Sequence, residues 1–114
     1  MSNRNWKLLF EDIVEGIDKI QNYTNNLPFD DFSTNSLVID AVVRNLEIIG
    51  EASKNVPLDI QEKFPDVPWQ KLKGIRNRIV HEYFRVDITI IWFIIQNELS
   101  SLKKVLGKHL SEDL

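Results

Sequence analysis

The sequence contains no cysteine among its 114 residues. Disulfides, thiolate metal sites and a catalytic cysteine are therefore excluded. Long hydrophobic runs are absent too, since the longest, Ile90 to Ile95, is far shorter than the roughly 20 residues that cross a bilayer. The amino-terminal stretch reaches Glu11, Asp12 and Glu15 too early for a signal peptide. We therefore expect a cytoplasmic protein with no membrane association.

The chain also lacks the patterns that mark several enzyme classes. Its two histidines, His81 and His109, supply no recognisable set of zinc ligands. It has no phosphate-cradling Walker loop and no nucleophile elbow, and its carboxylates are scattered rather than paired. We expect neither a metal nor a cofactor.

Positive charge is in the minority, and the net charge of −3 argues against a bulk electrostatic nucleic-acid binder. The balance is reversed in one stretch, where only Glu82 opposes a group of cations. They are Lys71, Lys73, Arg76, Arg78 and Arg85. These residues are candidates for binding RNA, although a solvated basic helix face would have the same composition.

No segment alternates as a β-strand does, whereas apolar residues recur every three or four positions in several stretches. The expected helices cover about residues 5–23, 34–55, 68–79 and 88–106, with a short helix or turn at 57–65 and a loop at 25–33. The expected caps are Ser33, Asp66 and Asp87, and Gly107 is the expected end of the last helix. The short loops imply antiparallel neighbours. We predict an all-α domain over residues 1–114, a bundle of four to five antiparallel helices.

The last expected helix is apolar on nearly every side between Ile88 and Ile95. A small bundle can bury such a helix only at its centre or against a second subunit. We favour the second explanation and expect a homodimer.

The stretch GIRNRIVHEYFRVD combines groups suited to cleaving a phosphodiester. Histidine transfers protons near neutral pH, and the planar guanidinium of arginine matches phosphate oxygens. RNA brings its own nucleophile, the 2′-hydroxyl, so Arg76 could stabilise the developing charge while His81 acts as base or acid. The spacing alone favours a structural role, because His81 could cap helix carbonyls while Arg76 and Tyr83 close a core.

Residues five apart on a regular helix are separated by about 140°. Arg76 and His81 therefore cannot reach one phosphate from an undistorted helix. Either the helix loosens near His81 or the site is shared across a dimer.

Three stretches together resemble the HepT-like toxins of the HEPN superfamily, over essentially the whole chain. They are AVVRNLEIIGEASKNVP, FPDVPWQKLKGIRNRIVHEYFRVD and IIWFIIQNELSSLKK. The family motif has an arginine, four residues, a histidine, one residue and a tyrosine, with a polar residue directly after the arginine. It corresponds here to Arg76, Asn77, His81 and Tyr83, without departure.

The resemblance implies a homodimer with the motif near the cleft between subunits. It also implies a metal-independent endoribonuclease, the toxin of a toxin–antitoxin pair, with Arg76 and His81 catalytic and Asn77 orienting the site. The partner would be a minimal, MntA-like nucleotidyltransferase antitoxin that transfers AMP from ATP to Tyr83 and so silences the toxin. We expect RNA products with 2′,3′-cyclic phosphate ends. The alternative is a non-catalytic helical module that only binds the nucleotidyltransferase.

Overall fold

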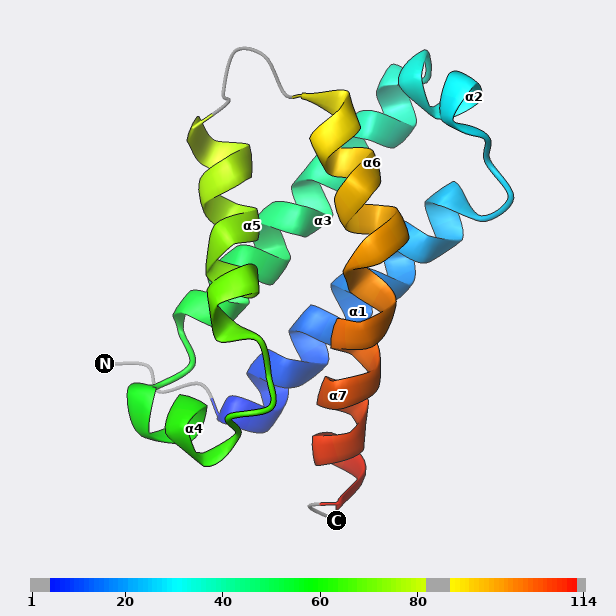
Figure 1. Cartoon of the computed structure of the whole chain (residues 1–114). Helices are drawn as coiled ribbons and strands as arrows, with labels where there is room; N and C mark the ends of the chain where they lie inside the picture. The colour runs from blue at the N-terminus through cyan, green and yellow to red at the C-terminus, as the bar shows by residue number, and fades with distance from the viewer. Residues whose placement is uncertain (1–4, 82–86, 113–114) are drawn as a thin grey trace.

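The computed structural model describes residues 5–81 and 87–112, and of residues 79–81 it describes only the backbone. Within these ranges the chain forms seven α-helices and no strand, as Figure 1 shows. Five are long: α1 (Trp6–Thr24), α3 (Ser36–Lys54), α5 (Trp69–His81), α6 (Ile88–Asn97) and α7 (Leu99–Glu112). Two are short: α2 (Phe29–Ser33) and α4 (Leu58–Lys63). The all-α prediction is confirmed, with more helices than expected.

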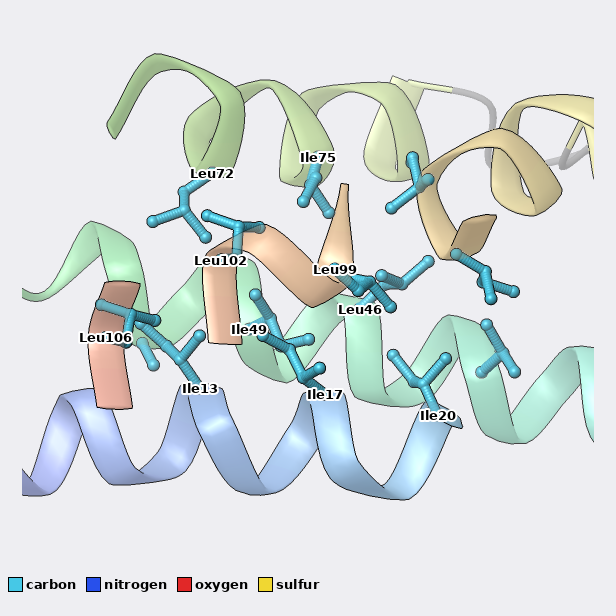
Figure 2. Close-up of a cluster of buried hydrophobic side chains, with 14 of the residues drawn as sticks. Ile13, Ile17, Ile20, Leu46, Ile49, Leu72, Ile75, Leu99, Leu102 and Leu106 are labelled. Carbon is cyan, nitrogen blue, oxygen red and sulfur yellow. The ribbon is translucent and has the colours of Figure 1, made fainter. Parts of the chain in front are cut away.

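Helix α3 is central to the arrangement, since α1 and α5 both pack against it (Figure 1). Helix α7 packs along α1, and α6 leads into α7. Figure 2 shows a core built where α1, α3, α5 and α7 meet. Its labelled members are Ile13, Ile17, Ile20, Leu46, Ile49, Leu72, Ile75, Leu99, Leu102 and Leu106, all essentially buried. Fully burying each such side chain contributes roughly 1.5–3 kcal/mol, so this core fixes α5 against α3.

The segment before α3 differs from the expected loop, because residues 29–33 form helix α2. Phe32 is fully buried, and its ring lies 5.0 Å from that of Trp92. This contact stabilises a helical turn that the polar composition concealed. The predicted cap Ser33 was also wrong: its hydroxyl donates to the Asp30 carbonyl, and the Asn35 side chain caps α3 instead.

The expected last helix is two helices. Its predicted cap is confirmed, since the Asp87 carboxylate accepts from the Thr89 backbone N–H at 3.0 Å. The helix breaks at Glu98, and α7 then continues through Gly107 to Glu112. Gly107 was therefore the wrong end. Packing of Leu106 and Leu110 against the core outweighs the roughly 1 kcal/mol that a glycine costs within a helix.

Helix α6 hides much of its apolar surface within the chain. Ile91, Ile94 and Ile95 are buried, and Trp92 packs on the rings of α2. Phe93 remains 52% exposed. Packing within the chain thus covers most of the apolar surface of α6. Phe93 is the large apolar side chain of this helix that remains exposed. No helix in the described ranges is long and apolar enough to cross a membrane.

Candidate active site

The site begins where α5 approaches α3 most closely. A Cβ atom placed on Gly50 of α3 would lie 2.6 Å from the Cβ of Arg76, much closer than real atoms of this kind approach. Glycine therefore permits the contact. This contact sets the position of Arg76 along α3, at the junction of α3 and α5.

The Arg76 side chain is oriented by a carboxylate on α3. Its Nε–H donates to Glu51 Oε2 at 3.2 Å. Both side chains are substantially exposed, so this ion pair contributes little to stability. Its effect is on orientation, because it holds the guanidinium through Nε, while the terminal nitrogens make no hydrogen bond with a described residue.

Arg76 lines a pocket of about 410 Å³ between α3, α4 and α5. The pocket is lined by Gly50, Ser53, Lys54, Leu58, Gln61, Trp69, Gln70, Lys73, Arg76 and Asn77. Cations and amides predominate in this set, and it contains no carboxylate from the part of the chain that the structure describes. An acidic protein thus has a positively charged pocket beside Arg76.

The predicted group of cations does not form a single face. Lys73 and Arg76 line the pocket, whereas Lys71 is exposed elsewhere on α5. Arg78 points to another partner, donating from Nη2 to Glu98 Oε1 at 3.1 Å. The Glu98 side chain is only 9% exposed, so this pair ties α5 to the α6–α7 break. Arg85 lies outside the described residues.

The rest of the predicted motif is described only in part. Asn77 is exposed and lines the pocket beside Arg76. His81 is the last residue of α5, but its side chain, like all of Tyr83, lies outside the described residues. Because α5 is helical from Trp69 to His81, the directions of residues 76 and 81 differ by about 140°.

The second histidine has a structural environment. His109 Nε2 lies 2.7 Å from Asp66 Oδ1, and the imidazole packs on the Phe64 ring at 4.5 Å between centroids. This hydrogen bond holds the pKa of Asp66 below its ordinary value of 3.8. Asp66 thus fastens α7 to the segment before α5, and its role as the cap of α5 stays a prediction. In the described part of the chain, no three potential metal ligands cluster together.

Sequence reasoning did not assign Glu51, Lys54 or Glu98 to any role. Glu51 and Lys54 lie on α3 and Glu98 at the break between α6 and α7, and only the packing of the helices brings them near α5. One signal was available: Gly50 lies inside a helical pattern, where a glycine costs about 1 kcal/mol relative to alanine and can therefore indicate a packing requirement.

Comparison with known proteins identifies the family of this chain. The family model described as "Ribonuclease HepT-like" matches residues 13–108. The chain belongs to the HepT-like ribonuclease family.

Individual relatives of this HepT-like chain align along almost its whole length. "Putative RNase MJ1216" of Methanocaldococcus jannaschii is 41% identical over 95% of this chain and 89% of its own. "Probable ribonuclease HepT" of Thermococcus cleftensis is 40% identical over 88% of this chain and 91% of its own. No solved structure matches the chain. The predicted family is therefore confirmed.

Proposed function

We propose that the protein is a metal-independent endoribonuclease, the toxin of a toxin–antitoxin pair. The observation that carries this proposal is the position of Arg76. It lines a pocket with Lys54 and Lys73 and with no carboxylate of the described residues, and its guanidinium is held through Nε while its outer nitrogens make no hydrogen bond with a described residue. That arrangement suits an RNA phosphate, and relatives of this chain are named as ribonucleases.

The reaction uses the 2′-hydroxyl of RNA as the nucleophile. His81 takes the proton of this hydroxyl as the oxygen attacks phosphorus, and the bond from phosphorus to the 5′-oxygen breaks. A second proton donor, an imidazolium, protonates the leaving 5′-oxygen. Arg76 stabilises the negative charge on the phosphate oxygens, and Asn77 orients the site. The products carry a 2′,3′-cyclic phosphate and a 5′-hydroxyl.

Two chains in a homodimer supply this site. A regular α5 separates the directions of Arg76 and His81 by about 140°, so one chain cannot direct both at one phosphate. A two-fold axis presents Arg76 of one chain beside His81 of the other, and it brings two histidines to one cleft. The pair then provides separate base and acid.

Activity is switched off by an MntA-like nucleotidyltransferase antitoxin that transfers AMP from ATP to the Tyr83 hydroxyl. The added phosphate repels RNA and obstructs the cleft. After co-expression of the two proteins, mass spectrometry should find AMP on the peptide that contains Tyr83 and none at Tyr23. The Tyr83→Phe variant should escape modification and keep its nuclease activity.

The test is incubation of purified, unmodified protein with RNA in excess chelator. We expect wild-type protein to cut RNA and leave 2′,3′-cyclic phosphate ends. His81→Ala should be inactive, and Arg76→Lys should lose at least about 100-fold in rate because a point charge cannot replace the bidentate fork. A strict metal requirement or 5′-phosphate ends would refute this mechanism. Intact RNA in every sample would favour the non-catalytic binding module.

A further inference from the structure

We propose that the pocket between α3, α4 and α5 is a subsite for a single nucleotide of the RNA strand, next to the scissile phosphate. The inference rests on the proposed ribonuclease function, because Arg76 belongs both to the proposed catalytic group and to the pocket wall. A nucleotide bound there lies beside the phosphate that Arg76 contacts. Its base is then the feature through which the enzyme chooses where to cut.

The charges of the pocket suit the sugar-phosphate backbone. Lys54 ends α3, and Lys73 lies on α5, so the two ammonium groups come from different helices across the pocket. Both are exposed, and neither forms an ion pair with a described residue. Their charge therefore remains available to phosphate, as does that of the outer Arg76 nitrogens.

The remaining polar groups suit the edge of a base. Gln61 donates from Nε2 to the Val56 carbonyl at 3.0 Å, which fixes its amide and leaves its side-chain oxygen as an acceptor. Gln70 and Asn77 are exposed at the pocket and offer both donors and acceptors. Unstacked RNA bases are recognised through such hydrogen bonds to their edges.

Apolar surface and size also agree with one base. Trp69 is held in place because its Nε1–H donates to the carbonyls of Gln61 and Phe64, at 3.1 and 3.0 Å. It lines the pocket together with Leu58, giving the aromatic and apolar contact that single-stranded bases use. The volume of about 410 Å³ holds one nucleotide and excludes a duplex.

The first experiment measures binding without cleavage. A fluorescent, single-stranded 2′-O-methyl RNA, which lacks the nucleophile, is titrated with wild-type protein and with Lys54→Gln and Lys73→Gln. Each variant should bind about five- to tenfold more weakly. Each should also lower the slope of log affinity against log salt by about 0.7, the value for one lost phosphate contact on a single strand. Lys104→Gln, an equal change of charge on α7 outside the pocket, should match wild type.

AMP and UMP serve as competitors in the same assay. We expect weak competition that disappears in the Lys54→Gln and Lys73→Gln variants. A mononucleotide that binds as tightly as the oligonucleotide would overturn the RNA subsite in favour of a free-nucleotide site. Melting temperatures of all variants verify that the exposed lysines were replaced without unfolding.

The second experiment maps cleavage sites on a random RNA pool. Gln70→Ala should raise KM and change the base preferred at one position beside the cut, while kcat stays within about twofold because no transition-state contact is removed. If wild type cleaves RNA and the pocket variants match Lys104→Gln in binding and in base preference, the subsite is refuted and the ribonuclease stands. If wild type cleaves nothing but binds RNA through Lys54 and Lys73, the proposed function fails and the binding site stands.

Discussion

Gly50 shows how one missing methyl group decides the geometry of the site. A Cβ there would lie 2.6 Å from the Arg76 Cβ and 3.2 Å from its Cα, atoms that cannot rotate away. Gly50→Ala must therefore push α5 outward. We expect it to lower the free energy of unfolding by about 1–3 kcal/mol, the usual cost of overpacking, and to reduce cleavage by displacing Arg76. Urea unfolding and RNA cleavage, measured well below the melting temperature, test both effects.

The matched control is Gly74→Ala on α5, where a Cβ would meet nothing within 4 Å. Alanine is the better helix former, so this variant should gain about 0.5–1 kcal/mol in the free energy of unfolding. Replacing glycine with alanine is thus expected to lower the free energy of unfolding at Gly50 and to raise it at Gly74. Destabilisation at Gly74 of the same size as at Gly50 would contradict the close-approach argument.

The sequence was sufficient to select Arg76 and His81 as the candidate pair, because their types and spacing carry the chemistry. It could not pair Arg76 with Glu51 or place Lys54 in the same pocket. Those contacts depend on how α5 crosses α3, which helical periodicity does not determine. The sequence thus selects the candidate motif, which stays a prediction, whereas the pocket around Arg76 could not be predicted from it.

At the scale of elements, the Arg78–Glu98 pair joins α5 to the break between α6 and α7. Glu98 is 9% exposed at its side chain and Arg78 about one-third exposed. Arg78→Gln leaves a nearly buried carboxylate without its cation, and we expect a loss of about 1–2 kcal/mol, less than for a fully buried pair. A double-mutant cycle with Glu98→Gln, followed by urea unfolding, measures the coupling between the two side chains.

The same cycle tests the prediction that Arg78 binds RNA. If Arg78 contacts RNA, Arg78→Gln should weaken RNA binding and lower the salt dependence of that binding. Glu98→Gln should leave the affinity and its salt dependence unchanged, or strengthen binding by releasing the Arg78 guanidinium. If Arg78 is only structural, both single variants lose stability and neither changes the salt dependence of RNA binding.

Helix positions followed from the sequence better than helix ends did. Periodic apolar residues located α1, α3 and α5, since each presents one side to the core in Figure 2. Helix α2 and the break at Glu98 were missed. Both depend on contacts distant in sequence, Phe32 with Trp92 and Glu98 with Arg78, which local propensity cannot register.

At the scale of the whole molecule, the Asp66–His109 hydrogen bond fastens the end of α7 to the segment before α5. The pKa of Asp66 is lowered in the folded protein by the His109 hydrogen bond. The hydrogen-bonded Asp66 carboxylate therefore adds to the free energy of unfolding when the pH is above the unfolded pKa of 3.8. This contribution is lost as the pH falls through the lower pKa of the folded protein. Asp66→Asn should reduce the melting temperature near neutral pH, and the difference from wild type should shrink below about pH 4.

Asp40→Asn is the control for this pH series. Asp40 is exposed on α3, and its carboxylate makes no hydrogen bond or ion pair with a described residue. Its melting temperature should follow that of wild type at every pH. A difference between wild type and Asp66→Asn that stays constant down to the lowest pH of the folded state would contradict the assignment to the carboxylate.

The proposed homodimer is the arrangement in which α5 can remain regular and still act on one phosphate. If each site takes Arg76 from one chain and His81 from the other, Arg76→Lys and His81→Ala chains are each inactive alone. Unfolded together and refolded as a mixture, they should form about half mixed dimers, in which one site regains Arg76 and one of its two histidines, and so recover at most about a quarter of wild-type activity. Sites contained within single chains would recover nothing.

Phe93→Glu, at an exposed position on α6 where folding tolerates charge, tests the contact surface. Introduced into both inactive chains, it should give monomers by light scattering and abolish the recovered activity, whereas recovery in monomers would refute the shared site.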